Sequence, residues 1–178
     1  MRRHKEVPPD PLTAALRMLA RRPYSLAEMR RALEKKYPDS NQVRRAIARL
    51  RELRYLDDKK FAEHYASSLA RNRAYGRQRI RRELKAKLVD YRQIEPALAQ
   101  AFEETSEPDL LEQTLEKKVR TLRLPLTRAK LAALCQSLLR RGFRSDDIMK
   151  AVRARPELRP LAQDAAALDD SNAESFGV

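Results

Sequence analysis

The chain has 178 residues, of which 36% are charged, and its formal net charge at pH 7 is +14. Only three glycines, no tryptophan and few β-branched residues exclude a β-rich fold, and the many Ala, Leu, Arg and Glu residues favour an all-α one. A single cysteine excludes an internal disulfide framework, and the strong positive charge favours a polyanionic partner, either nucleic acid or an anionic membrane surface.

The chain begins with a basic segment. Residues 1–9 contain Arg2, Arg3, Lys5 and two prolines, and we expect them to form a mobile basic arm. No apolar run follows this arm, and no later stretch reaches the length of a membrane span. We therefore expect a cytoplasmic protein without a membrane partner.

Three groups of three helices are predicted after the arm, from helical periodicity and capping signals. In the first repeat, residues 10–56, helices are expected over 11–21, 25–36 and 40–54. In the second repeat, residues 57–105, they are expected over 58–73, 76–88 and 91–103. In the third repeat, residues 106–155, they are expected over 108–122, 126–141 and 145–154.

The helix starts carry recognisable capping residues. Ser25 followed by Glu28 predicts a capping box, in which the hydroxyl and the carboxylate satisfy backbone donors reciprocally. Asp39 and Asp90 lie at the same repeat position, and each is followed three residues later by glutamine. Asp57, Ser106 and Ser145 open three further helices, and the acids Asp146 and Asp147 after Ser145 are favourably placed against the helix dipole.

The first two repeats align without a gap at a shift of 51 residues. Met29 then falls on Ile80 and Leu33 on Leu84, and the turn residue Asp39 falls on Asp90. A weaker third copy needs a further shift of 54 residues. Three short helices cannot bury much apolar surface alone, so we expect tandem three-helix bundles that lean on one another in an elongated, gently curved protein.

No catalytic or metal-binding constellation is present in the sequence. His4 and His64 are isolated from each other and from Cys135, which lies at apolar helical spacing and is expected to be a buried thiol. The carboxylate pairs Asp57-Asp58 and Asp146-Asp147 are explained by helix capping. We therefore predict a protein that is not an enzyme and has no cofactor, metal or small-molecule substrate.

The densest positive charge lies in the second repeat, between residues 71 and 87, where eight basic residues stand against Glu83 alone. Arg77, Arg81 and Lys85 are spaced to form a cationic ridge along one helix, which suits a phosphate backbone, and Tyr75 and Tyr91 flank it for base stacking. The alternative is that these cations are solvated or pair with acids elsewhere on the surface. The predicted DNA-contact residues are Arg71, Arg73, Arg77, Arg79, Arg81, Arg82, Lys85 and Lys87, with Arg30 and Arg31 as weaker candidates.

The last segment, residues 156–178, has the opposite charge. It contains five acidic residues and only Arg159 as a base, which gives a net charge of −4, and we expect it to be a disordered acidic tail. Subtracting this tail from the total of +14 leaves a body of +18. Any DNA contact by that body is expected to be independent of base sequence and sensitive to salt.

Three motifs carry a resemblance to a known family. Leu53-Arg54-Tyr55-Leu56-Asp57-Asp58-Lys59-Lys60-Phe61-Ala62 is similar to the G-Y-L-D-D-x-x-F-A signature of the RecX family. The run from Ala74 to Leu84 resembles its G-x-x-x-I-x-x-E-L segment, and Arg141-Gly142-Phe143 with Asp147-Ile148 resembles its C-terminal element. Arg54 and Leu88 stand where the family pattern often has glycine, and the acidic tail has no counterpart in it.

The resemblance implies tandem three-helix repeats and a cytoplasmic regulator of RecA, the bacterial recombinase. Such a regulator lodges in the groove of the RecA–DNA filament and restrains ATP hydrolysis, strand exchange and induced self-cleavage of the SOS repressor. The residues themselves leave two other readings open. One is a helix-turn-helix DNA-binding regulator, because three-helix units present a recognition helix. The other is a helical scaffold whose charge serves solubility only.

Overall fold

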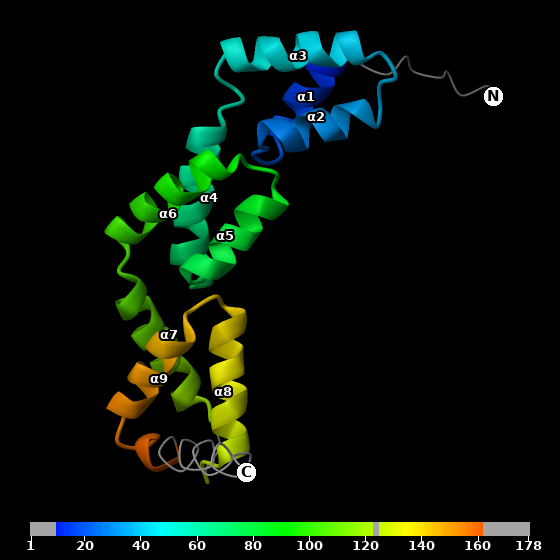
Figure 1. Ribbon diagram of the computed structural model, residues 1–178. Helices are drawn as coiled ribbons and strands as arrows, with labels where there is room; N and C mark the ends of the chain where they lie inside the picture. Colours follow the sequence, from blue (N-terminus) through cyan, green and yellow to red (C-terminus); the bar gives the residue numbers. More distant parts are fainter. Residues whose placement is uncertain (1–9, 123–124, 162–178) are drawn as a thin grey trace, which may run out of the picture. The chain divides into compact units, whose positions relative to one another are not determined.

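The computed structural model describes residues 10–122 and 125–161, and all regular secondary structure within them is helical (Figure 1). The helices are α1 (Pro11–Leu19), α2 (Leu26–Glu34), α3 (Ser40–Glu52), α4 (Asp58–Arg73), α5 (Arg77–Ala86), α6 (Tyr91–Glu104), α7 (Glu107–Arg120), α8 (Arg128–Arg140) and α9 (Ser145–Ala154). Each begins and ends within two residues of its predicted bounds. The predicted all-α class and the tandem order of three-helix repeats are confirmed.

Two compact units make up the chain, and they do not coincide with the three repeats. The first unit combines the residues up to 66 with residues 83–97, and the second combines residues 67–82 with those from 98 onward. The division runs across α4, α5 and α6. The second repeat therefore contributes to both units.

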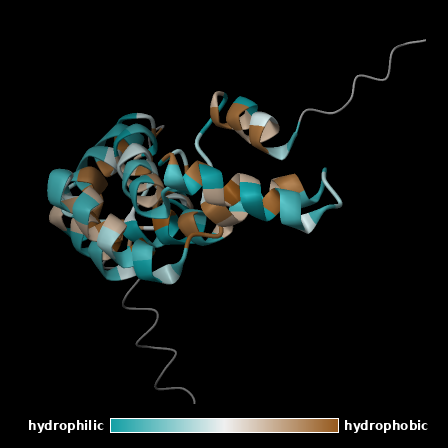
Figure 2. Ribbon diagram, turned by 90° about the horizontal axis from the view of Figure 1, so that it is seen from above, coloured by the Kyte–Doolittle hydropathy of each residue, from teal (hydrophilic) through white to brown (hydrophobic). Residues whose placement is uncertain are grey.

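The core of the first unit is formed where α1 and α2 pack against α3 (Figure 1). Figure 2 shows hydrophobic residues interspersed with hydrophilic ones along the helix ribbons, as amphipathic helices require. The buried apolar side chains of this core recur at helical spacing and are Ala14, Ala15, Met29, Leu33, Val43, Ile47, Leu50 and Leu56.

The core of the second unit is formed by α7, α8 and α9. Leu111, Leu115, Leu134, Leu138 and Ile148 are all buried in it. Cys135 packs at its edge, and burial raises the pKa of its thiol above the ordinary value, as expected for a structural cysteine.

This packed core continues past residue 155, where the acidic tail was expected to begin. Leu158 is only 1% exposed and belongs to the core of the second unit, so its burial fixes the start of the expected tail against α7–α9. Residues 1–9 and 162–178, which contain the predicted basic arm and most of the predicted acidic tail, lie outside the described residues.

Most of the predicted caps form, but Ser145 does not cap α9: it is the first residue of that helix, and Arg144 stands at the N-cap position without a side-chain hydrogen bond. The carboxylate of Asp39 accepts hydrogen bonds from the backbone N–H groups of Asn41 and Gln42, and Asp57, Asp90 and Ser106 cap their helices in the same way. Ser25 also accepts the backbone N–H of Glu28 at 3.1 Å. The reciprocal half of that capping box was predicted wrongly, because the Glu28 carboxylate turns to Arg22 and Lys87 instead.

The two positions at which the family pattern has glycine adopt a left-handed backbone conformation. Arg54 has a φ of 58° and Leu88 a φ of 59°, and each follows the end of a helix, α3 and α5 respectively. A side chain in this conformation is strained, and glycine relieves the strain without loss at a helix end. These residues also explain why the helices predicted over 40–54 and 76–88 were slightly too long.

Replacing Arg54 by glycine is expected to stabilise the protein by about 1 kcal/mol, because the left-handed conformation costs a non-glycine residue about that much. The measurement is thermal unfolding followed by circular dichroism. The matched control is Arg45→Gly, which removes another exposed arginine from the interior of α3, where glycine destabilises a helix by about 0.5–1 kcal/mol. Equal losses of stability in both variants would contradict the account of Arg54.

Candidate nucleic-acid interface

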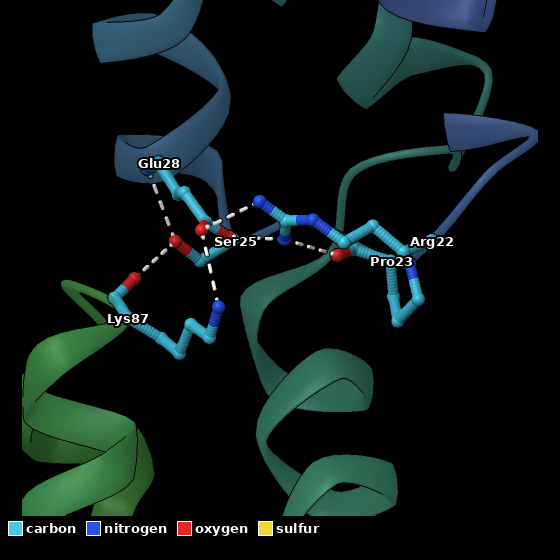
Figure 3. Close-up of polar contacts among 5 residues, drawn as sticks. All are labelled: Arg22, Pro23, Ser25, Glu28 and Lys87. Carbon is cyan, nitrogen blue, oxygen red and sulfur yellow. Dashed lines mark hydrogen bonds and ion pairs between the residues drawn. The ribbon is translucent and has the colours of Figure 1, made fainter. Parts of the chain in front are cut away.

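The first unit contains a junction between the first and second repeats, formed at the N-terminus of α2 (Figure 3). Ser25 is fully buried, and its hydroxyl donates a hydrogen bond of 2.5 Å to the backbone carbonyl of Lys87 at the end of α5. The backbone N–H of Leu26 donates to the Asp58 carboxylate in the first turn of α4, at 2.7 Å. We call these contacts junction 1.

Charged side chains close junction 1 (Figure 3). The Lys87 ammonium donates to Glu28 at 3.2 Å, and the Arg22 guanidinium donates to both oxygens of the same carboxylate at 2.9 and 3.0 Å. Burial opposes ionisation of Glu28, but these hydrogen bonds outweigh it and hold the pKa of the carboxyl below its ordinary value. The stabilisation is therefore present at neutral pH and is lost as the pH falls through that lowered pKa.

The second unit contains an equivalent junction between the second and third repeats, which we call junction 2. The backbone N–H of Gly76 donates to the carbonyl of Arg141 at 2.8 Å, and that of Gln78 donates to the carbonyl of Gly142 at 3.2 Å. The backbone N–H of Arg77 donates to the Glu107 carboxylate in the first turn of α7, at 2.7 Å.

The two junctions use corresponding residues of successive repeats. A shift of 51 residues carries Ser25 and Leu26 onto Gly76 and Arg77, and a shift of 54 carries Lys87 onto Arg141. In both junctions the start of a second helix meets the end of the next repeat's second helix, and a carboxylate from the next first helix binds its free N–H. This pairing brings a positive helix end to a negative one and satisfies backbone groups that helix ends leave unpaired.

The junctions engage several of the cations that the sequence assigned to DNA. Lys87 belongs to junction 1, and Arg77 lies in junction 2, where its guanidinium pairs with Glu107 at 3.4 Å and covers the ring of Phe102. Arg71 pairs with Glu104 at 3.3 Å. Arg77 therefore packs against α6 and α7 with its charge paired, while the ridge of Arg77, Arg81 and Lys85 stays a prediction as a DNA contact.

The remaining predicted cations differ in exposure. Arg79 and Arg81 are half-buried, and Arg79 lies over the ring of Tyr75. Of the ten cations predicted to contact DNA, five are exposed and have no acidic group at ion-pair distance among the described residues, and these are Arg30, Arg31, Arg73, Arg82 and Lys85. Their charges remain available to phosphates.

Three neighbouring cations, Arg141, Arg140 and Lys118, were missed by sequence reasoning. The Arg141 guanidinium donates to the carbonyl of Arg73 at 2.6 Å, so it lies at the end of α4. Lys118 of α7 is close by, and its pKa is lowered by burial and by the neighbouring charges of Arg141 and Arg140. Such mutual repulsion marks a local excess of positive charge. A sequence signal exists only for Arg140-Arg141, since Lys118 lies among mixed charges.

The two tyrosines proposed for base stacking are in different environments. Tyr91 is 72% exposed at the start of α6, and its ring is accessible. Tyr75 is half-buried, and its ring lies below the Arg79 guanidinium at 5.5 Å. The prediction of a stacking residue therefore remains open for Tyr91 and is weakened for Tyr75.

The chemistry offered by these groups is the attraction of anions. In the described residues, no group of three or more histidine, cysteine, aspartate or glutamate side chains is arranged to hold a metal ion. No helix found there combines the length and the apolar character that crossing a membrane requires. Exposed arginines and lysines without acidic partners bind phosphates through charge and hydrogen bonds, irrespective of base sequence.

Comparisons with known proteins agree on one family. Residues 12–50 match the model of the first three-helix domain of RecX, and residues 57–98 match that of its second three-helix domain. The chain is 36% identical to the regulatory protein RecX of Chlorobaculum tepidum over 80% of its length and 86% of that protein's. It is 34% identical to the regulatory protein RecX of Cronobacter sakazakii, covering 80% and 90% of the two chains.

A solved structure supports the same fold. The crystal structure of RecX from Lactobacillus salivarius superposes with a TM-score of 0.69, at 24% sequence identity, and covers 81% of this chain and 93% of that one. At this level of identity the similarity concerns the fold alone.

Replacing Gly142 by alanine is expected to destabilise the protein by roughly 2–4 kcal/mol through overpacking and backbone strain. Gly142 has a φ of 91°, and a Cβ there would lie 2.2 Å from the backbone nitrogen of Arg79. The matched control is Leu88→Ala at the corresponding position of junction 1, where 42% of the residue is exposed and a small change is expected. Thermal unfolding measures both, and equal effects would show that junction 2 is not closely packed.

Proposed function

The chain belongs to the RecX family of regulatory proteins, and on this premise we propose that it binds the RecA recombinase and its filaments on DNA. In this role it restrains ATP hydrolysis and strand exchange by the recombinase and the induced self-cleavage of the SOS repressor. It acts in the cytoplasm by binding and not by catalysis.

The observation that carries the proposal is the match to both RecX three-helix domains, together with relatives that are similar over most of their length. The junctions support it physically, because each fixes the second helix of one repeat against the next. A binding surface that spans several recombinase subunits needs such fixed geometry within each unit.

Contact with DNA is the second part of the proposal. We assign it to the exposed cations Arg73, Arg82 and Lys85, with Arg141 beside Arg73 and its chain neighbour Arg140. Arg30 and Arg31 of α2 remain weaker candidates. We expect these side chains to contact phosphates, which are present in every sequence, so both single- and double-stranded DNA are expected ligands.

The alternative is a helix-turn-helix regulator that binds one operator. The order of helices in each repeat favours it, because a third helix after a turn is the usual recognition element. Such a protein protects one defined sequence, whereas the proposed function requires binding that is indifferent to sequence.

ATP hydrolysis by RecA on single-stranded DNA is expected to slow when the purified protein is added at or below stoichiometric amounts. A coupled ATPase assay on preformed filaments gives the measurement, because addition after assembly separates filament regulation from competition for free DNA. A large excess of single-stranded DNA serves as the control for sequestration. An unchanged rate across the range, with no co-sedimentation on filaments, would refute the regulatory proposal.

Substituting Arg73, Arg82 and Lys85 together by alanine is expected to weaken DNA binding and to flatten its salt dependence. Three lost phosphate contacts reduce the slope of log affinity against log salt by about 2.7 on duplex DNA. Fluorescence anisotropy over a salt series measures this slope. The comparison variant, Arg71→Ala, removes a single cation whose exposed pair with Glu104 is weak, so its slope is expected to fall by no more than one phosphate contact, about 0.9. A triple variant with the wild-type slope would show that these cations do not touch DNA.

A further inference from the structure

The outer face of α3 carries a surface of arginines that the sequence analysis did not single out. Arg44, Arg45, Arg49 and Arg51 are all exposed, and Ala48 lies among them. The four arginines and the one acid of α3, Glu52, give this helix a net charge of +3. We call these four arginines with Ala48 the α3 face.

The α3 face is accessible to a ligand. Asn41, Arg44, Arg45 and Ala48 line an open depression along the helix. Arg44 is held by a hydrogen bond to the Asn41 side chain, and Arg49 pairs with Glu52 at 3.1 Å, with both side chains more than half exposed. Such an exposed pair contributes little and is readily exchanged for a phosphate.

The repeat fold does not require this charge. The buried positions of the third helices are shared: Val43, Ile94 and Ile148 correspond at the repeat shifts, and each is nearly fully buried. The exposed positions are not shared, since the residues of α6 that correspond to the four arginines are Glu95, Pro96, Gln100 and Phe102. By the same count, one base and three acids give α6 a net charge of −2, and α9 has two of each, so its net charge is 0.

We propose that the α3 face is a second binding surface for the phosphate backbone of nucleic acid, formed by Arg44, Arg45, Arg49 and Arg51 around Ala48. Arg44 and Arg51 are separated by seven residues, or about 10 Å along the helix axis, which spans about three phosphates of one strand. Ala48 lets the backbone approach closely between them. The planar guanidinium groups offer paired donors to phosphate oxygens.

The composition of the α3 face favours nucleic acid over an acidic protein. Specific protein interfaces place aromatic or other apolar anchors at their centre, and the only apolar side chain at the centre of this face is Ala48. A phosphate backbone needs no apolar anchor and is bound by regularly spaced cations on a rigid helix. The proposal deepens the DNA contact of the proposed function but needs no recombinase for its test.

The experiment compares two variants of the full chain that lose the same number of charges. Arg44→Ala with Arg45→Ala removes two cations of the α3 face, whereas Lys150→Ala with Arg153→Ala removes two exposed cations from α9, the corresponding third helix. Binding to a labelled 30-nucleotide single strand and to a duplex of equal length is followed by anisotropy over a salt series, without RecA. Circular dichroism confirms that each variant is folded.

The α3 variant is expected to flatten the salt slope by about 1.8 on duplex or about 1.4 on single-stranded DNA, and the α9 variant by much less. Arg44→Lys with Arg45→Lys keeps both charges and is expected to keep the slope. Equal flattening by the α3 and α9 variants would overturn the proposal, because net charge alone would then account for binding. A wild-type slope in the α3 variant would also overturn it, because the two arginines would then make no contact with phosphates.

The two proposals fail separately. Loss of DNA affinity in the α3 variant, with a wild-type protein that leaves the RecA ATPase unchanged, would support the α3 face and refute regulation of the recombinase. Slowing of the ATPase by wild type, with an unaltered salt slope in the α3 variant, would give the opposite result.

Discussion

The capping of α2 and α5, each by the repeat that follows it, is the constraint on which the rest of the structure depends. Ser25 is fully buried, so its hydroxyl must find a partner inside the protein, and the carbonyl of Lys87 is that partner. The N–H of the next residue, Leu26, donates to Asp58 in α4, the first helix of the following repeat. A repeat cut at residue 56 would lose both partners and expose polar helix ends. For this reason the compact units run across the second repeat and do not stop at its edges.

The same constraint divides the cations into two classes with different consequences. Those at the junctions hold the chain together: Lys87 and Arg22 share the Glu28 carboxylate, and Arg77 shares Glu107 between its backbone and its side chain. Their charge is largely neutralised by these acids. Cations such as Arg82, on the exposed side of α5, have no acid beside them, so their positive charge contributes to the attraction of polyanions. A high net charge therefore overstates the number of groups that can bind DNA, and only the contacts of each side chain separate the two classes.

Much of the fold was predictable from the sequence, because helix periodicity and most caps act within a few residues. Asp39 binds the N–H groups of the two helical residues that follow Ser40, and that signal is local. The junctions were not predictable, since Ser25 and Lys87 are 62 residues apart and nothing in either residue type specifies the pairing. Glu28 was predicted wrongly for the same reason. Its carboxylate binds Lys87 of the next repeat, 59 residues away, and not the backbone N–H at the start of its own helix. The candidate site was predicted least well, because the density of charge in a sequence does not show which arginines pair with acids in the fold.

The repeats share their buried positions and their junction positions. They differ in the residues on their outer faces, and these residues determine which partners each repeat can bind. Arg45 and Pro96 occupy corresponding exposed positions, while the neighbouring Ala46 and Ala97 are both buried. Interior side chains are restricted by packing, whereas an exposed position is free to take any charge that a partner requires. A regulator that must meet both a recombinase and its DNA gains from this freedom, because one repeat can present arginines to phosphates while another presents acidic or neutral residues. The proposed function assigns such a division to the unlike charges that α3 and α6 carry on a shared scaffold.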